Sequence, residues 1–317
     1  MSDDFPVSVS VIVPAHNAEA TVLEAVKSAL NQELIQAEVI VCDDASKDNT
    51  RDLVGGFSDA RLRLISNDSN FGPGRSRDRA ISASTGEWVA LLDADDAWAP
   101  NRIGRLLEAA RTTRADVIFD DLMLCHDTER GLVPWRAVHG THAFGGHGPE
   151  ARTVSTEDYI RSPRLIAQPI VRTDFIRKND IRHSERKFAE DAEFILRLAH
   201  AGARFCYFPE PMYLYRITPG SLTARARDPA LMRHCLRECS QWTGWSGEAL
   251  LAFDQKIAAL KRTEALYALV EAVKSGNVAS ALGLLASSPG VLRELPSRAL
   301  RQIDYQWHRR RHGGHKR

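Results

Sequence analysis

The sequence lacks a long apolar run, a cysteine framework and a strong net charge. No uninterrupted apolar stretch reaches about 18 residues, the length that a helix needs to span a bilayer. The five cysteines include no Cys-x-x-Cys pair, and their odd number favours reduced thiols over disulfides or a zinc site. Because 42 basic residues face 41 acidic ones, the charge balance does not predict nucleic acid as a partner.

The composition is that of a globular protein. With 317 residues, of which 44% are hydrophobic, the chain can bury one large core, or one core and a smaller appendage. The first residues, Met1 to Asp4, are acidic rather than basic, so we expect no signal peptide. The predicted location is therefore the cytoplasm.

Charge is uneven only near the C-terminus. After Pro296 there are seven basic residues and one acidic residue, Asp304. Two interpretations stand side by side. The tail either binds an anionic membrane surface at the inner face of the cell membrane, where each basic residue adds about 1 kcal/mol, or it is solvated.

Strand-like and helix-like segments alternate through the first half of the chain. Strands are predicted at 7–13, 38–42, 61–65, 87–92 and 115–119, and segments such as 19–32 between them show helical spacing of apolar residues. This alternation predicts an α/β fold with a mostly parallel sheet covered by helices on both faces. Beyond about Asp228 the pattern is helical alone. We therefore expect one domain over 1–225 and a helical region with a basic tail over 226–317.

Carboxylates gather where two of the predicted strands end. Asp93, Asp95 and Asp96 follow the strand over 87–92, and Asp43 and Asp44 close the strand over 38–42. Such charges repel one another unless a cation neutralises them, and Mg²⁺ commonly combines one or two carboxylates with substrate phosphates. The alternative is a solvated acidic turn before a helix. Because ligands of parallel sheets bind at the carboxyl ends of strands, the coincidence of two clusters favours a metal–diphosphate site.

Five segments then follow one protein family in order and spacing. The chain resembles the family 2 glycosyltransferases with a GT-A fold, and among them the bacterial exopolysaccharide enzymes of the succinoglycan type. The segments are Val9–Asn17, Val39–Thr50, Asn70–Asp78, Gly86–Pro100 and Glu190–Leu198. The resemblance implies a Rossmann-like αβα sandwich with a mostly parallel sheet, followed by a C-terminal helical region.

The resemblance also implies a function. It indicates an inverting enzyme, dependent on Mn²⁺ or Mg²⁺, that moves a hexose from a UDP-sugar to a saccharide or polyprenyl-diphosphate-linked acceptor. Glucose is the first choice of hexose, and the pathway is the synthesis of a surface polysaccharide. Two other functions are weighed against it: a nucleotidyltransferase, which would want a Gly-rich loop after the first strand, and a non-catalytic saccharide-binding or scaffold protein of the same fold.

Carried over residue by residue, the resemblance assigns a donor site. Asp95 is the first choice of metal ligand, and Asp93 and Asp96 share contacts with metal, ribose or donor sugar, next to Ala94. Asp44 takes the role of the carboxylate that accepts a hydrogen bond from uracil N3, while Asp43 braces the loop. The nucleotide-binding turn consists of Pro14, Ala15, His16 and Asn17, and His16 stands where many members have a base-stacking Tyr.

The remaining assignments concern basic residues and a general base. Arg77 is placed near the uracil or phosphates and Arg216 near the diphosphate, with surface salt bridges as the alternative for Arg77. Glu190 and Asp191 match the base motif of the family, with Asp191 as the general base and Glu190 as support. Considered without the family, this pair would be an acidic helix N-terminus stabilised by the macrodipole. The Gly- and His-rich stretch over 131–150 is predicted to be a loop lining a substrate cleft.

Overall fold

The computed structural model describes residues 7–33, 36–129, 131–144, 146–165, 167–217 and 229–287. The chain divides into two compact units. The first comprises residues 1–125 and 134–216, and the second comprises 126–133 and 217–317. The proposed assignment of functional domains, 1–225 and 226–317, stays a prediction.

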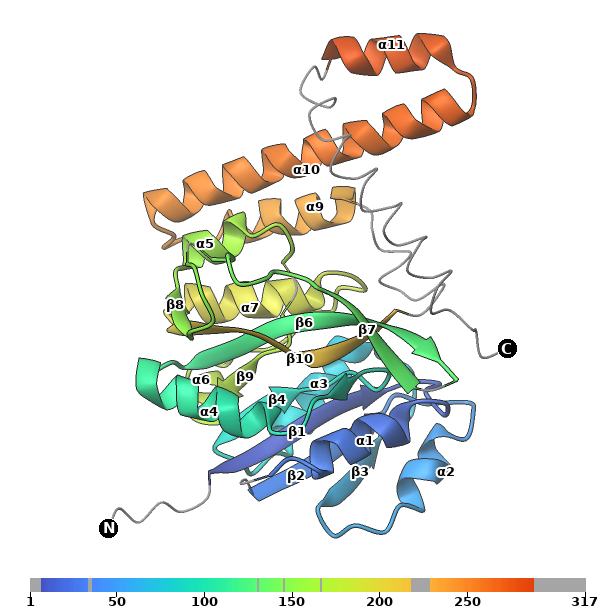
Figure 1. Cartoon of the computed structure of the whole chain (residues 1–317), viewed down its shortest axis with the longest axis vertical. Helices are drawn as coiled ribbons and strands as arrows, with labels where there is room; N and C mark the ends of the chain where they lie inside the picture. The colour runs from blue at the N-terminus through green and yellow to red at the C-terminus, as the bar shows by residue number, and fades with distance from the viewer. Residues whose placement is uncertain are drawn as a thin grey trace. The chain divides into compact units, whose positions relative to one another are not determined.

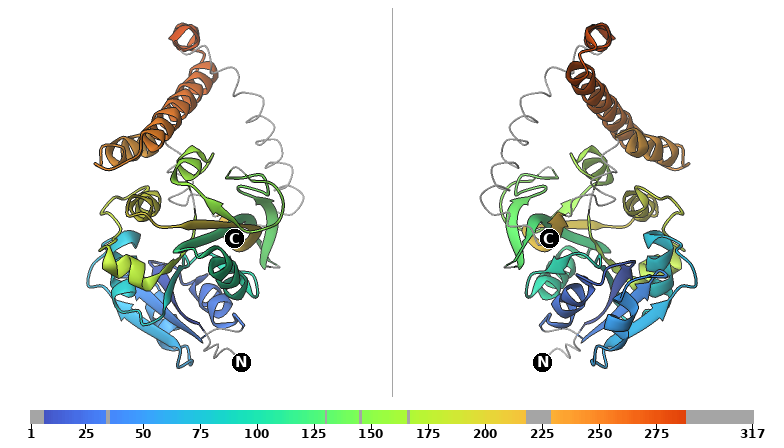
Figure 2. Two further views of the ribbon diagram at one scale, coloured as in Figure 1. Left: turned by 90° about the vertical axis from the view of Figure 1, so that its left-hand side faces the viewer. Right: turned by 90° about the vertical axis from the view of Figure 1, so that its right-hand side faces the viewer.

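The N-terminal half forms the parallel part of the sheet. Strands β1 (Ser8–Ala15), β2 (Gln36–Asp43), β3 (Leu62–Ser66) and β4 (Trp88–Leu91) pair in the order β3-β2-β1-β4. The Val- and Ile-rich sequences of β1 and β2 suit strands that are buried on both faces. Figures 1 and 2 show α1 (Val22–Leu30) and α4 (Arg102–Thr113) on one face and α3 (Pro73–Ser82) on the other. The helix α2 (Thr50–Gly55) connects β2 and β3.

The other half of the sheet is antiparallel. Strand β9 (Ile170–Arg172) runs antiparallel to both β4 and β6 (Val117–Thr128), and β10 (Phe205–Ile217) runs antiparallel to β5 (Ala97–Trp98) and β8 (Arg152–Val154). The predicted α/β sandwich is confirmed, but its mostly parallel character holds only for β3-β2-β1-β4. Hydrophobic periodicity indicates a strand without its direction, which depends on how the intervening chain returns to the sheet.

Several elements are longer or more regular than predicted. The stretch 131–150, predicted to be a loop, begins with a strand, β7 (Gly131–Ala137), and β10 is a single long strand. The shorter helices α5 (Thr156–Arg161) and α6 (Thr173–Lys178) precede α7 (Glu190–His200). The prediction of a loop therefore holds for 138–150 only.

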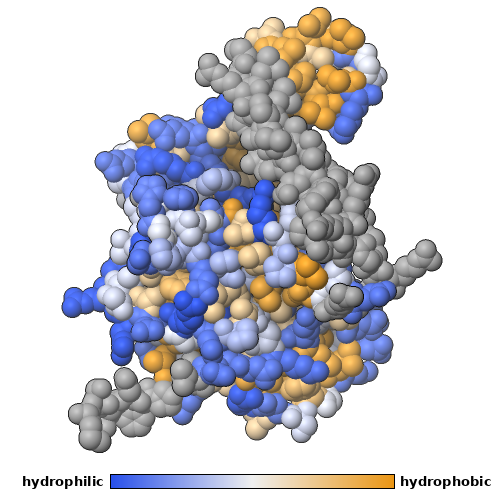
Figure 3. Space-filling model, in the orientation of Figure 1, coloured by the Kyte–Doolittle hydropathy of each residue, from blue (hydrophilic) through white to orange (hydrophobic). Residues whose placement is uncertain are grey.

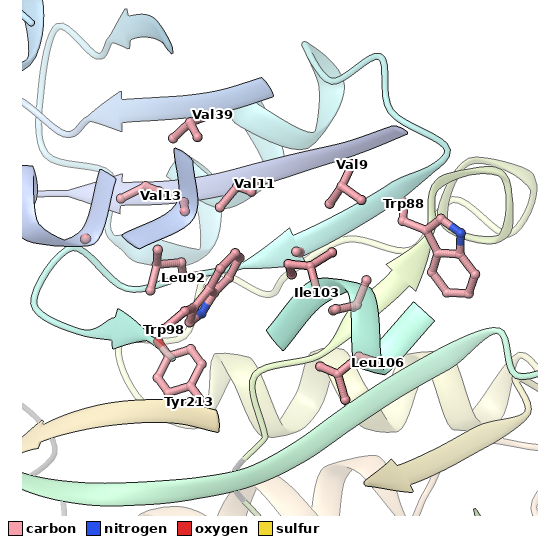
Figure 4. Close-up of a cluster of buried hydrophobic side chains, with 14 of the residues drawn as sticks. Val9, Val11, Val13, Val39, Trp88, Leu92, Trp98, Ile103, Leu106 and Tyr213 are labelled. Carbon is pink, nitrogen blue, oxygen red and sulfur yellow. The ribbon is translucent and has the colours of Figure 1, made fainter. Parts of the chain in front are cut away.

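The core lies between the parallel strands and the helices α1 and α4, which cover one face of the sheet. Val9, Val11 and Val13 point to one side of β1 because side chains alternate along a strand, and Ile103 and Leu106 of α4 meet them (Figure 4). Trp98 and Tyr213 extend this cluster toward the end of the sheet where β1, β2 and β4 terminate. That end is thereby rigidly supported.

The second unit is helical in its described residues beyond 229. Helices α9 (Pro229–Cys239) and α10 (Gly247–Lys274) contact each other, and Leu266 and Leu269 of α10 pack against α11 (Val278–Ser287). Figure 3 shows apolar side chains gathered over α11, where Val278 and Leu282 are exposed. Among the described helices none has the length and apolar character to cross a membrane. The predicted basic tail falls outside the described residues.

Candidate active site

Three polar segments meet at one edge of the sheet. In the parallel register Ala15 of β1 lies beside Asp43 of β2, and Ile12 lies beside Leu91 of β4. The turn over 14–17, the pair Asp43–Asp44 and the cluster 93–96 thus follow neighbouring strand ends. Ligands of α/β sheets bind at such an edge, where the strand order reverses between β1 and β4. This position defines the candidate site.

The three carboxylates of the 93–96 cluster have different surroundings. Asp93 accepts hydrogen bonds from Arg77 Nη2 at 2.7 Å and from Gln168 Nε2 at 2.8 Å. Asp96 is buried, and its Oδ1 accepts a hydrogen bond from the backbone N–H of Arg216 at 2.7 Å. Asp95 is the exposed member. Partial desolvation of this carboxylate by the surrounding protein, together with the charge of Asp93, raises the pKa of Asp95 to about 6.

This cluster suits a hard divalent cation. Burial, and after it the charges of Asp95 and Asp93, raise the pKa of Asp96, so a bound cation would stabilise the charged form of these carboxylates. All donors are carboxylate oxygens, which Mg²⁺ and Mn²⁺ accept. The described residues contain no ready group of three metal-ligating side chains. A cation bound at Asp95 therefore needs further ligands, as diphosphate oxygens would provide.

The turn beyond β2 is organised by Asp44. Its Oδ1 accepts hydrogen bonds from Asn67 Nδ2 at 2.7 Å and from the N–H of Phe71 at 3.0 Å, and its Oδ2 accepts one from the N–H of Gly72 at 2.8 Å. The side chain of Asp43 is buried, and its Oδ1 has no hydrogen-bond partner among the described residues. The backbone oxygen of Asp43 accepts a hydrogen bond from the N–H of Asn67 at 2.8 Å, and the prediction that Asp43 braces the loop stays a prediction. Asp44 braces the loop through its side chain, because it stands one residue beyond the strand and reaches the next loop.

The turn after β1 carries an exposed imidazole with a defined orientation. His16 Nδ1 lies 2.8 Å from the backbone oxygen of Asp44, and His16 Nε2 lies 3.0 Å from Asn17 Nδ2. Since a carbonyl oxygen only accepts and an amide nitrogen only donates, these partners define a neutral ring with its proton on Nδ1. Asn17 has a φ of 51° and joins the turn to the next loop by accepting a hydrogen bond from Lys47 N at 2.8 Å.

Arg77 is a buried bridge between the two acidic motifs. Its Nη2 binds Asp93 at 2.7 Å and its Nη1 binds Glu190 at 3.2 Å, although these two carboxylates are almost a hundred residues apart in sequence. The guanidinium is 6% exposed. Arg77 thus forms ion pairs with nearby carboxylates, as the alternative for this residue expected, but in a buried position rather than on the surface. Its proposed contact with the nucleotide remains a prediction.

Arg216 secures the other side of the 93–96 cluster. Besides the backbone bond to Asp96, its Nε donates to the backbone oxygen of Asp95 at 2.6 Å, and its Nη2 pairs with Glu24. The residue lies near the end of β10 and is 5% exposed. The structure thus places Arg216 directly against the cluster, where it holds the turn, and its approach to the diphosphate stays a prediction.

The predicted general base Asp191 and its neighbour Glu190 lie at the start of α7. Asp191 Oδ1 accepts the N–H of Ala192 at 2.7 Å, and Ala189, just before the helix, has a φ of 62°. Burial first, and then the charge of Glu190, raise the pKa of Asp191 to about 7, against the opposing effect of Arg77. A helix dipole by itself would lower this pKa. A raised pKa suits a proton acceptor, and the role of Asp191 as general base stays a prediction.

Two supporting residues escaped sequence reasoning. Gln168 is 5% exposed and fixes Asp93 Oδ2, while its backbone oxygen accepts a hydrogen bond from Arg102 Nη2 at 2.9 Å. Tyr213 Oη accepts the N–H of Asp93 at 3.1 Å. Neither residue belongs to a recognisable pattern, because each acts through a contact that bridges 75 or 120 positions. No local signal was available to find them.

The loop over 138–150 is anchored by a buried carboxylate. Asp121 accepts hydrogen bonds from the N–H groups of His139 at 2.8 Å and Gly140 at 2.6 Å, and it is fully buried. The exposed rings of His142 and His147 lie farther along, with their Nδ1 atoms 2.8 Å apart. The role of this loop in lining a substrate cleft remains a prediction.

The fold and the acidic strand ends are those of a GT-A glycosyltransferase. Residues 10–166 match the model of the family described as glycosyl transferase family 2, and the chain belongs to that family. It is therefore an enzyme that transfers a glycosyl group, and the alternative of a non-catalytic scaffold is set aside.

Individual relatives support the family assignment. The succinoglycan biosynthesis protein ExoO of Rhizobium meliloti (strain 1021) is 28% identical over 90% of this chain and 83% of its own length. The Escherichia coli protein WfgD, a UDP-Glc:α-D-GlcNAc-diphosphoundecaprenol β-1,3-glucosyltransferase, is 41% identical over 30% of this chain and 38% of its own. Staphylococcus aureus TarS 1–349, solved in complex with UDP-GlcNAc, has a TM-score of 0.65 and 22% identity over 92% of this chain and 82% of its own, and shares the fold.

Proposed function

We propose that this chain is an inverting, metal-dependent hexosyltransferase that transfers glucose from UDP-glucose to a lipid-diphosphate-linked saccharide during exopolysaccharide synthesis. The observation that carries the proposal is the bridge formed by Arg77. It joins a carboxylate cluster suited to a metal–diphosphate group and a carboxylate pair with the raised pKa of a general base. The buried guanidinium of Arg77 thereby links the carboxylates proposed for the donor end of the site to those proposed for the acceptor end.

The donor end accounts for the residues around the strand ends. Asp95 would hold Mn²⁺ or Mg²⁺, which stabilises the negative charge of the departing diphosphate when it is bound. Asp44 uses three of the approximately four hydrogen bonds that a carboxylate can accept. One position on Oδ2 is left for the N3–H of uracil. The fixed ring of His16 is exposed beside it, and Arg216 stands next to Asp95 on the diphosphate side.

The acceptor end is the site of proton transfer. Asp191 accepts the proton of the acceptor hydroxyl while that oxygen forms its bond to the anomeric carbon. The bond from the anomeric carbon to the diphosphate oxygen breaks on the opposite face, so the configuration inverts. A pKa of about 7 leaves roughly half of the Asp191 carboxyls deprotonated at neutral pH and makes the carboxylate more basic than an ordinary aspartate. Glu190 supports this state, and Arg77 compensates the charge of Glu190.

The substrate classes rest on the relatives. ExoO is named for succinoglycan biosynthesis, and WfgD is named as a glucosyltransferase that acts on a diphosphoundecaprenol-linked sugar. These names support glucose as the hexose and a polyprenyl-diphosphate-linked saccharide as the acceptor. Such an acceptor places the reaction at the inner face of the cell membrane. The nucleotidyltransferase alternative is not favoured, since the turn at 14–17 contains no glycine.

A donor panel tests the proposal. UDP release is measured with UDP-glucose, UDP-galactose and UDP-GlcNAc, using a synthetic GlcNAc-α-diphospho-undecyl acceptor, with Mn²⁺ and with EDTA. We expect turnover with UDP-glucose that EDTA abolishes and added Mn²⁺ restores. Preference for another UDP-sugar would overturn the choice of glucose, and full activity in EDTA would overturn the metal dependence.

A further inference from the structure

Phe71 is an exposed aromatic residue in an otherwise well-covered unit. The described residues expose eight large apolar side chains, and seven of them belong to helices α9, α10 and α11. The eighth is Phe71, which is 47% exposed and lies between β3 and α3. Exposing a phenylalanine forgoes the free energy that its burial would contribute. A single exposed apolar side chain is common on protein surfaces, so a binding role for Phe71 depends on what surrounds its ring.

The backbone holds Phe71 in this exposed position. Its N–H donates to Asp44 Oδ1 at 3.0 Å, and the N–H of Gly72 donates to Asp44 Oδ2 at 2.8 Å. Gly72 has a φ of 88°, a conformation that favours glycine, and Pro73 then begins α3. The backbone N–H groups of Phe71 and Gly72 are thus both anchored, so a preorganised loop presents the ring.

One face of the ring carries a cation. The guanidinium carbon of Arg75 lies 5.5 Å from the ring centroid, and Arg75 in turn pairs with Glu185. A guanidinium over an aromatic face is attracted by the ring quadrupole and orients the side chain. The rest of the exposed ring remains available to a planar ligand. Stacking is the interaction that such a surface offers, and it is well suited to a nucleobase.

The position of Phe71 relates it to the nucleotide rather than to the sugar. Phe71 and His16 both bond to Asp44, one to its carboxylate and the other to its backbone oxygen. We propose that Phe71 stacks on the uracil ring of the UDP-sugar, with Arg75 behind it. This inference rests on the proposed function, in which Asp44 binds uracil N3. Phe71 would be a binding residue for the base that contributes nothing to the diphosphate.

The test compares ligands that contain the base with one that lacks it. Dissociation constants of UDP and of inorganic pyrophosphate, each with Mn²⁺, are measured for the wild type, Phe71→Ala and Phe71→Trp. Removing a stacked aromatic ring weakens binding of a base by roughly tenfold. We expect Phe71→Ala to weaken UDP binding by that factor and to leave pyrophosphate binding unchanged. Phe71→Trp should retain UDP binding, and UDP should quench its added fluorescence.

A matched control and defined outcomes complete the design. Tyr267 of α10 is 41% exposed, and Tyr267→Ala should leave the affinity for UDP unchanged. Equal UDP affinity of Phe71→Ala and wild type would overturn the inference, as would a parallel loss of pyrophosphate binding. If the wild type bound pyrophosphate but not UDP, the proposed function itself would fail, which is a different result.

Discussion

Replacing Asp191 by Asn should abolish transfer and at the same time stabilise the protein at alkaline pH. Burial and Glu190 raise the pKa of Asp191 from 3.8 to about 7. Between pH 4 and pH 7 the folded chain therefore keeps a proton on Asp191 that the unfolded chain releases. Because the native state binds more protons in this window, this residue makes stability fall as the pH rises.

The magnitude follows from the two pKa values. At about 1.4 kcal/mol per pH unit, a rise from 3.8 to about 7 corresponds to at most about 4 kcal/mol above pH 7. Relaxation around the partly accessible carboxylate reduces this cost, and we expect Asp191→Asn to gain about 1–2 kcal/mol at pH 8. The gain should become small near pH 4, where wild-type Asp191 is protonated in the folded state and partly protonated in the unfolded state, whose pKa is 3.8. Transfer should fall by about 10²- to 10⁴-fold, as for loss of a general base.

Urea unfolding of both proteins from pH 4 to pH 9 measures the gain, and UDP release at pH 8 measures the activity. Asp254→Asn is the matched control, because Asp254 is exposed and lies beyond the first turn of α10. It should not show the gain in stability that is expected for Asp191→Asn. Equal stability of Asp191→Asn and wild type at every pH would refute the burial argument. Full transfer activity of the variant would refute the assignment of the base.

Three further perturbations test separate parts of the structure. Glu190→Gln removes a charge that raises the pKa of Asp191, so the acid limb of the kcat–pH profile should move down by about one unit; an unchanged limb would contradict this coupling. Asp95→Asn should raise at least tenfold the Mn²⁺ concentration that half-saturates UDP binding, and an unaltered Mn²⁺ titration would assign the metal to another ligand. Gly86→Ala should destabilise the fold by about 2–3 kcal/mol in urea unfolding, because its Cβ would lie 2.6 Å from Ser10 N; wild-type stability would show that β1 can yield there.

Local patterns in the sequence accounted for the architecture of the first half and for the location of the site. Alternating strand and helix periodicity predicted β1 to β4, and parallel strands bring their carboxyl ends together. The prediction that Asp93–Asp96 lies near Asp44 therefore needed only the order of the strands. Periodicity did not reveal that β9 runs antiparallel to β4. Strand direction is not a property of a short apolar segment.

The different surroundings of the carboxylates depended on contacts that join distant parts of the chain. Arg77 forms ion pairs with both Asp93 and Glu190, and Gln168 donates a hydrogen bond to the other oxygen of Asp93. Asp95 is then the exposed carboxylate of the cluster. The side chain of Asp44 braces the loop that contains Phe71 and Gly72. The residue types and their order along the chain showed that an acidic site exists at this edge of the sheet. Which carboxylate is paired, buried or accessible followed from three-dimensional packing, because hydrogen bonding and desolvation depend on neighbours in space.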